Sequence, residues 1–241
     1  SGYNFDQSGV DEAGATASLD VEDAIVGRQS VRAFLRDKPV SRELIERILS
    51  IAGRSPSGSN VQPWKVWVVQ GAMRDTVSKA LQAEHDTGAA STREFDYYPK
   101  DWPDPVYYGR RRACGIGLYS TLGIGKEDKA GMHAQHGRNF QFFDAPVSVI
   151  VTVHRGLALG SWMDCGMFIQ TFMLAARTQG LETCPQAALA HYQHTLRTCL
   201  SIPAGQIILS GIALGYADPD ATVNTYRTPR IALDDFVTWT N

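Results

Sequence analysis

Apolar residues recur along the chain in helix-like and strand-like periods, which predict a mixture of helices and strands from residue 21 onward. Residues 21–27 place apolar side chains three and four positions apart and end in glycine, which predicts a short helix. An apolar stripe over residues 44–52 predicts a second helix, which Ser41 can cap. Residues 1–18 are small and polar without a period, so they are expected to form a flexible N-terminal arm.

Three apolar runs are typical of strands, at residues 64–70, 147–153 and 207–216. The last two are almost continuously apolar, so they are predicted to be central strands of a sheet. Residues 164–181 are apolar nearly all round, which predicts a buried helix. Residues 55–64 are dense in Ser, Pro, Gly and Asn and are predicted to form a loop.

Two segments do not fit this regular pattern. Residues 90–130 are aromatic, proline-rich and charged, and they are expected to leave the core and return as a helix through Leu118 and Leu122. Residues 228–241 are polar and then apolar, with no local core to pack against. Because the chain shows neither a repeat nor a linker, we expect one α+β domain over residues 19–241.

Composition narrows the possible classes of function. The chain has 241 residues and a formal net charge of −2, with a pI near 6.3, which argues against a nucleic-acid-binding protein. Four cysteines are too few for a disulfide framework, and Cys165, Cys184 and Cys199 lie in apolar surroundings. We expect buried thiols in a reducing, cytoplasmic compartment. The sequence shows neither a signal peptide nor an apolar run of about 20 residues, so no membrane association is expected.

Polar residues typical of metal or hydrolase sites are not suitably spaced. His133 and His136, like His191 and His194, lack the spacing of a helical zinc site, so surface positions are expected and no metal is predicted. There is also no G-x-S-x-G sequence for a serine hydrolase. Asp164 opens the predicted apolar helix, where a carboxylate would serve as a cap.

The stretch GRQSVRAF, residues 27–34, indicates an anion site. In an extended chain Arg28, Ser30 and Arg32 share one face, and a planar guanidinium suits a phosphate. The alternative is a solvated segment after a helix. Further polar groups occur in loops, which favours a phosphorylated ligand that itself carries the chemistry. These further groups are Pro56, Ser57, Asn60, residues 184–186, Arg227 and Arg230.

Taken in order, these segments resemble the FMN-dependent nitroreductase family. The stretch RNFQFFDAPV, residues 138–147, is similar to the branch of nitrobenzene and nitrobenzoate reductases. The resemblance implies a nitroreductase-like FMN-binding fold, with a central mixed β-sheet flanked by helices, in an intertwined homodimer. It rests on GRQSVRAF at 27–34, SPSGSNVQPW at 55–64, MFIQTFMLAARTQGL at 167–181 followed by ETCPQAA at 182–188, and RTPRIALDDFV at 227–237.

The resemblance also implies roles for individual residues. Arg28 would bind the FMN phosphate with Arg230 as a second clamp, and Ser30 would bind the ribityl or phosphate region. Arg32 would lie near the pyrimidine edge and stabilise the reduced flavin. No catalytic side chain is expected, because the flavin carries the chemistry. The implied cofactor-binding set is Arg28, Gln29, Ser30, Arg32, Pro56, Ser57, Gly58, Asn60, Asp164, Pro185, Gln186, Ala187, Arg227 and Arg230.

The resemblance implies a homodimer with its active sites at the interface. The 55–60 loop would reach the flavin of the other subunit, and residues 228–241 would cross to the partner. The alternative is that this C-terminal segment packs on its own subunit. A small aromatic substrate would be walled by aromatic side chains, which could equally serve ordinary packing. The candidates are Tyr97, Tyr98, Trp102, Tyr107, Tyr108, Phe140, Phe142 and Phe143.

The implied reaction is a two-electron exchange at one site. NAD(P)H would reduce the flavin and leave, and a nitro compound would then be reduced to the nitroso and hydroxylamine stages. One alternative is another acceptor on the same FMN scaffold, as in reductive dehalogenation or in quinone or enone reduction. The other alternative is a flavin-binding protein without catalytic activity.

Overall fold

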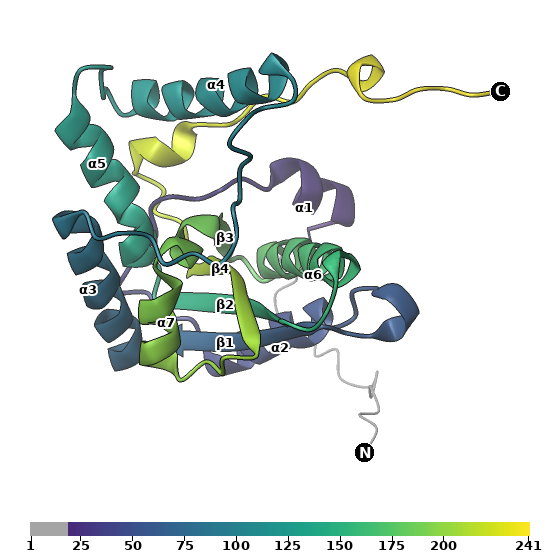
Figure 1. Cartoon of the computed structure of the whole chain (residues 1–241), viewed down its shortest axis with the longest axis horizontal. Coiled ribbons are helices and arrows are strands. Elements are labelled where there is room, and N and C mark those ends of the chain that lie inside the picture. The colour runs from purple at the N-terminus through teal and green to yellow at the C-terminus, as the bar shows by residue number, and fades with distance from the viewer. Residues whose placement is uncertain (1–18) are drawn as a thin grey trace, which may run out of the picture.

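The computed structural model describes residues 19–241, so the arm predicted over residues 1–18 lies outside the described part of the chain. Helices and strands interleave, as the hydrophobic pattern predicted (Figure 1). The helices are α1 (Val21–Gly27), α2 (Arg42–Ala52), α3 (Gly71–Thr87), α4 (Pro105–Thr121), α5 (Lys129–Gly137), α6 (Leu159–Thr178) and α7 (Gln193–Leu200). The strands are β1 (Trp64–Gln70), β2 (Val147–His154), β3 (Glu182–Gln186) and β4 (Gln206–Gly215).

The four strands form one sheet in the order β1-β2-β4-β3, with the two strongly apolar strands inside, as predicted. The α+β class is confirmed, but the expected mixed sheet is not: every strand pairing within residues 19–241 is antiparallel. The reason is the position of β4. Strands β2 and β3 run in the same direction and are joined through α6, but β4 lies between them and is antiparallel to both.

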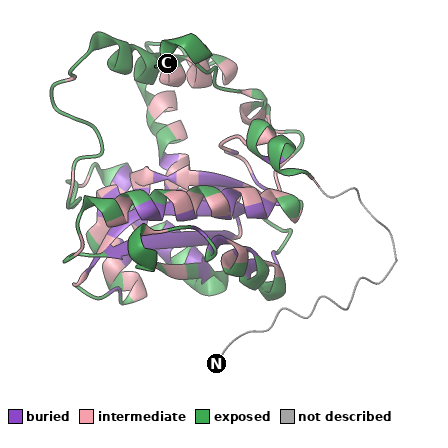
Figure 2. Ribbon diagram, turned by 90° about the vertical axis from the view of Figure 1, so that its right-hand side faces the viewer, coloured by how far each residue is buried: buried purple, intermediate pink, exposed green. Residues whose placement is uncertain are grey.

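Alternating side chains of β2 supply two hydrophobic cores, one on each face of the sheet. Val149 packs in the cluster covered by α2 and α6, whereas Ile150 packs in the cluster covered by α3 and α7. Phe172 of α6 and Leu81 of α3 are both fully buried at these two faces. Figure 2 shows the buried residues concentrated in the sheet and on the helix sides that face it.

Helix α6 begins earlier than predicted, and the added residues expose apolar side chains. It begins at Leu159 rather than near Asp164, and its N-cap is Ala158, so Asp164 is not the cap that the sequence suggested. Phe168 packs inward, but Leu159 and Met163 are 77% and 69% exposed. Within the predicted range 164–181 the apolar side chains are buried or partly buried, as predicted, and the exposed Leu159 and Met163 lie before that range.

The excursion predicted from residues 90–130 is present and carries α4 away from the sheet (Figures 1 and 2). Leu118 lies in α4, Leu122 follows its last residue, and no residue of α4 is buried. The Tyr226 hydroxyl donates to the Cys114 carbonyl at 3.1 Å, and its ring lies against Gly117, where a β-carbon would come within 2.6 Å of the phenol oxygen. The C-terminal segment therefore contacts α4 before it extends away from the body.

None of the helices among the described residues is both long and apolar enough to cross a membrane. The four cysteines are unpaired, with Cys165 and Cys184 buried as predicted and Cys199 only partly buried. Burial raises the pKa of the Cys184 thiol to about 11, so this side chain is an uncharged part of the core at neutral pH.

Candidate ligand-binding site

The segment after α1 runs extended beside the edge strand β3, as its spacing predicted. The Val31 amide donates to the Thr183 carbonyl at 3.0 Å, and the Val31 side chain is buried. Arg28, Ser30 and Arg32 lie at the mouth of a cleft of about 600 Å³, which we call the arginine cleft. Its lining residues are Ile25, Val26, Arg28, Gln29, Ser30, Arg32, Cys114, Gln170, Tyr226, Arg227, Thr228 and Arg230.

Two further arginines reach this cleft from the C-terminal segment. The Arg227 guanidinium donates to the carbonyls of Val26 and Gly27 at 2.9 and 3.2 Å, where α1 ends and its carbonyls lack helical partners. Arg230 donates to the Thr228 hydroxyl at 2.6 Å. Folding therefore brings together positively charged groups that lie about 200 residues apart in the sequence.

Asn224 fixes the position of the extended segment, although sequence reasoning did not select it. Its side-chain oxygen accepts from the Arg32 amide at 2.9 Å, and its side-chain nitrogen donates to the Ala33 carbonyl at 2.9 Å. Its backbone carbonyl accepts from the Gln29 side chain at 3.1 Å. A single asparagine in a polar tail carries no sequence signal for this role, because the role depends on a contact between distant segments.

The charge in the arginine cleft is not neutralised by the residues that line it. The lining residues include no Asp or Glu, and none of the four arginines forms an ion pair with another described residue. The carboxylate that acts on Arg28 belongs to Glu182, which pairs with Arg177 at 3.3 Å. Burial, and then repulsion from Arg230 and Arg227, lower the pKa of Arg28. A bound anion would relieve this repulsion, so the cleft suits a phosphate.

A second cleft, the central cleft, continues from the first. It has a volume of about 480 Å³, and Gln170 of α6 lines both clefts. Pro185 and Ala187 line it from the end of β3, whereas the Gln186 side chain is 1% exposed and donates inward to the Asn139 carbonyl at 2.8 Å. Of the predicted residues Pro185, Gln186 and Ala187, only Pro185 and Ala187 therefore line the cleft. Gln170 was missed, although a polar residue within an apolar helix is a usable signal.

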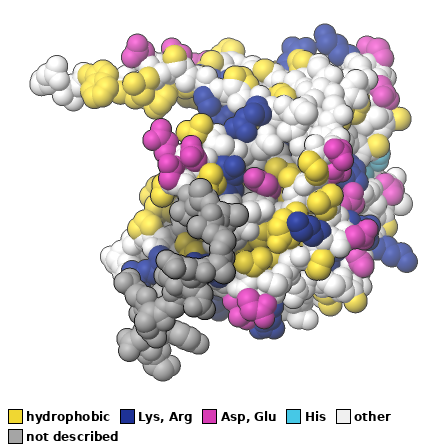
Figure 3. All heavy atoms as spheres, turned by 180° about the vertical axis from the view of Figure 1, so that it is seen from behind, with side chains coloured by type: hydrophobic (Ala, Val, Ile, Leu, Met, Phe, Trp, Pro, Cys, Tyr) yellow, Lys and Arg dark blue, Asp and Glu magenta, His cyan; other side chains and the backbone are white. Residues whose placement is uncertain are grey.

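A third cleft, the aromatic cleft, follows the central one and also measures about 480 Å³. Phe95, Tyr97 and Ala187 line both, so the three clefts are neighbours, and we call them together the trough. Figure 3 views the molecule from behind, where basic side chains gather beside apolar ones near the base of the C-terminal segment. The aromatic cleft is lined by His85, Arg93, Phe95, Tyr97, Tyr98, Arg111, His136, Phe140, Ala187, Ala188, Ala190, His191 and Tyr192.

The predicted aromatic residues divide into four groups. Tyr97, Tyr98 and Phe140 line the aromatic cleft, although Phe140 is only 1% exposed and also belongs to the core. Trp102 packs against Tyr98 and Tyr108, with ring centroids 5.8 and 6.0 Å away, but does not line the cleft. Tyr107 is 50% exposed on α4. Phe142 and Phe143 are at most 2% exposed in the core, so packing, the alternative to a substrate contact, describes these two residues.

The 55–60 loop and Asp164 are not among the residues that line the trough. Gly58 donates its amide to the Asp164 carboxylate at 3.2 Å, and Asp164 is 5% exposed. The Ser57 hydroxyl accepts from the Gln62 amide at 2.9 Å. Pro56, Ser57, Gly58 and Asn60 are absent from the lining of all three clefts. Asp164 therefore holds the loop against α6.

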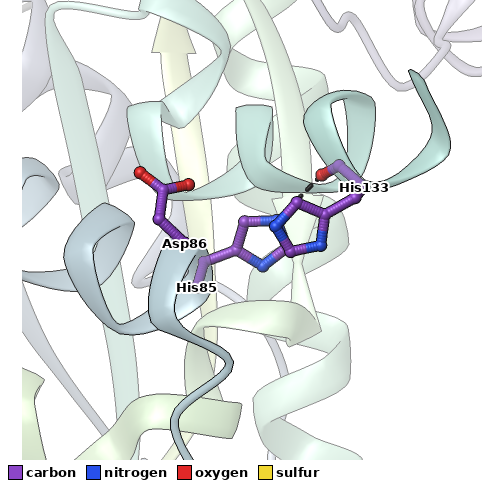
Figure 4. A group of neighbouring side chains, drawn as sticks. All are labelled: His85, Asp86 and His133. Carbon is purple, nitrogen blue, oxygen red and sulfur yellow. Dashed lines mark hydrogen bonds between the residues drawn. The ribbon is translucent and has the colours of Figure 1, made fainter. Parts of the chain in front are cut away.

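One group of described side chains approaches the spacing of metal ligands, namely His85, Asp86 and His133 (Figure 4). The rings of His85 and His133 are stacked 3.9 Å apart and only 13° from parallel, so the lone pairs in the two ring planes do not converge. His85 Nε2 is bonded to the His133 carbonyl at 2.8 Å, and Asp86 accepts from Gln82. This arrangement is one of packing and hydrogen bonding rather than metal ligation.

The fold and the trough define an α+β protein with an arginine-lined cleft at the edge of an antiparallel sheet, next to an aromatic pocket. The model of the Nitroreductase family matches residues 25–216, and the chain belongs to this family.

Named relatives extend over almost the whole chain. A 4-nitrobenzoate reductase of Nocardioides sp. is 40% identical over 93% of this chain and 92% of its own length. A nitrobenzene nitroreductase of Ectopseudomonas oleovorans is 35% identical over 91% of this chain and 96% of its own. The crystal structure of the FMN- and NADPH-dependent nitroreductase NfnB from Sphigopyxis sp. strain HMH is 40% identical, with a TM-score of 0.88, covering 92% of this chain and all of that one.

Proposed function

We propose that this protein is an FMN-dependent NAD(P)H oxidoreductase that reduces nitroaromatic compounds and works as a homodimer. Full-length similarity to nitroarene reductases and to an FMN- and NADPH-dependent nitroreductase supports this function. The observation that carries the proposal is the arginine cleft, because it gathers Arg28, Arg32, Arg227 and Arg230 without a lining carboxylate. Such a site matches the terminal phosphate of FMN.

The residues of the trough fit the parts of FMN in order. Arg28 and Arg230 hold the phosphate, with Arg227 beside them, and Gln29 and Ser30 serve the phosphate or ribityl region. The buried Gln29 Oε1 has no hydrogen-bond partner among the described residues, and it can accept from a ribityl hydroxyl. Gln170 lies where the arginine cleft meets the central cleft, at the passage from ribityl chain to ring.

FMN held in this trough would supply two-electron redox chemistry. One NAD(P)H would supply the two electrons that, with two protons, convert a nitro group to a nitroso group with loss of water, and a second NAD(P)H would supply the two electrons for the hydroxylamine. Arg32 provides a fixed positive charge at the pyrimidine edge, where the reduced ring is anionic. Pro185 and Ala187 form the wall of the central cleft beside the ring. Protons can come from water, so no acidic side chain is required.

Exposed apolar surface supports the homodimer. The outer face of α6 exposes Leu159 and Met163, and the C-terminal segment exposes Leu233, Phe236 and Trp239 at 56%, 63% and 75%. This segment extends beyond the body with apolar side chains along it (Figures 1 and 3). Isolated subunits rarely leave so much apolar surface in water. We infer that residues 228–241 dock on a second copy and that its 55–60 loop completes the flavin site.

The cofactor content of the purified protein tests this function. Heat release and chromatography should yield FMN at about one per subunit, and anaerobic oxidation of NADPH or NADH should accelerate when a nitroarene is added. FAD in place of FMN, or failure of the apoprotein to take up FMN, would reject the flavin assignment. Bound FMN without turnover of a pyridine nucleotide would instead indicate a flavin-binding protein.

A further inference from the structure

The aromatic cleft carries positive charge that the proposed flavin site does not use. Its thirteen lining residues include two arginines and three histidines but neither Asp nor Glu. Phe95, Tyr97, Tyr98 and Phe140 supply aromatic walls. A neutral aromatic ring would need only the walls, so the cations indicate that the ligand also bears a negative charge.

Arg111 is the cation best placed to meet that charge. It lies on α4, and its guanidinium carbon is 4.5 Å from the centre of the Tyr98 ring. This contact orients the guanidinium without neutralising it, because an aromatic face has no net charge. Arg111 forms no ion pair with any other residue of the described range 19–241. It therefore presents an orientated, unneutralised donor to the cleft.

Arg93, in the connection between α3 and α4, supplies a second positive charge. Its ion pair with Asp96 is 3.1 Å long, but both side chains are about half exposed, at 51% and 49%, so water screens the pair. The charge of Arg93 also acts on the cleft: after burial, it is the largest influence that lowers the pKa of His191. Arg93 thus adds to the positive potential without being fixed there.

Two histidines of the cleft, His136 and His191, have a pKa below the ordinary value for histidine. Burial lowers the pKa of His136 first, and His85, His191 and His133 lower it further by repulsion. Neutral imidazoles offer polar ring atoms but no formal charge. The two arginines are the lining residues whose positive charge does not depend on titration near neutral pH.

We propose that the aromatic cleft selects aromatic acceptors that carry a carboxylate, with Arg111 as the residue that recognises the carboxylate and Arg93 as an auxiliary charge. This inference rests on the proposed nitroreductase function. The aromatic ring of the substrate lies between the aromatic walls of the cleft. The reducible group of the substrate points toward Ala187, which the aromatic and central clefts share. A planar carboxylate matches the fork of a guanidinium.

Equilibrium binding of benzoate and benzamide to the FMN-loaded protein tests the assignment without turnover. Perturbation of the flavin absorbance reports each ligand, and the two differ mainly in charge. Benzoate should bind more tightly than benzamide. Arg111→Gln should lower the affinity for benzoate by about tenfold or more, because one charge-assisted contact is lost. The affinity for benzamide should change by no more than about twofold. Arg111→Lys should retain part of the preference, since it keeps the charge without the fork.

Arg110→Gln is the matched control. Arg110 belongs to the same helix, its guanidinium carbon is 5.7 Å from the centre of the Tyr107 ring, and it is not a lining residue. The change removes the same charge one residue away, so it should leave benzoate binding unchanged. An equal loss of benzoate in both variants would show a diffuse effect of charge and would overturn the assignment to Arg111.

The remaining outcomes separate the two proposals. Equal affinity of the unaltered protein for benzoate and benzamide would overturn carboxylate recognition. A loss of NADPH affinity in Arg111→Gln, with NADH and benzoate unaffected, would assign this arginine to the 2′-phosphate of NADPH and would also overturn it. If benzoate discrimination is found but no nitroarene is reduced, the proposed reaction fails while the carboxylate site stands.

Discussion

The arginine cleft and the aromatic cleft both place arginines beside a pocket, but they hold them differently. Arg28 and Arg32 belong to a backbone segment fastened to β3 and to Asn224, and buried Val31 lies between them. Arg111 belongs to α4, which has no buried residue. The first site is preorganised by the core, whereas the second stands on a helix outside it.

This difference corresponds to two kinds of ligand. A cofactor that stays bound gains affinity from donors already in position, because little entropy is lost on binding. Substrates that must enter and leave in turn need a site that can adapt, and segments with few buried contacts are the easiest to displace. The comparison predicts that changes in the arginine cleft alter cofactor retention, whereas changes on α4 alter selectivity.

The largest expected effect comes from removing residues 231–241. If this segment docks on a second copy, its loss should convert the dimer to monomers at micromolar concentration and release most of the FMN. Light scattering gives the mass, and absorbance near the flavin bands gives the FMN content. A truncated protein that stays dimeric and fully loaded would show that the segment packs on its own subunit and does not contribute to the flavin site.

Arg28→Ala tests the preorganised cleft itself. Removing a charge-assisted contact to a phosphate costs about 1.5–3 kcal/mol, or about ten- to a hundredfold in FMN affinity. Riboflavin, which lacks the phosphate, serves as the matched ligand and should bind nearly as before. Arg28→Lys should recover only part of the loss, because a lysine cannot bind bidentately. Titration of the apoprotein with each flavin gives the affinities, and an equal loss for both flavins would refute a phosphate contact.

Arg32→Ala should have a smaller and different effect. Oxidised FMN should bind nearly as before, but the two-electron potential should fall by tens of millivolts, since about 30 mV corresponds to about 1.4 kcal/mol. The physical reason is the loss of a fixed cation near the anionic reduced ring. Arg32→Lys should restore most of the potential. Redox titration with a reference dye measures it, and an unchanged potential would reassign Arg32 to a structural or phosphate contact.

The smallest expected effect concerns pH and the histidines of the aromatic cleft. Because folding lowers the pKa of His136 below its ordinary value of 6.5, the unfolded chain binds the proton more readily. The stabilisation from this group is complete above pH 6.5 and decreases as the pH falls through that value toward the folded pKa. His136→Gln should reduce the loss of stability between neutral and acidic pH, as measured by urea unfolding. If the pH dependence of stability is the same in the variant, His136 does not contribute to it.

Much of the fold and part of the trough could be predicted from local pattern. Period and turn chemistry identified β2 and β4 as central strands, the extended run after α1, and the return helix of the excursion. These features depend on neighbours within a few residues, so a linear pattern records them. The arginines of one short stretch could be selected for the same reason, because their spacing alone puts them on one face.

The tertiary structure decided how segments that are far apart in the chain lie relative to one another. The position of β4 between β2 and β3 made the sheet antiparallel, and α6 began five residues earlier than Asp164, at Leu159. Asn224 and Arg111 gained their roles only when the C-terminal segment and α4 came to lie beside the trough. The amino-acid sequence alone determined which segments are apolar, extended or charged, because these are local properties. The partners of each side chain depend on packing, which no local pattern records.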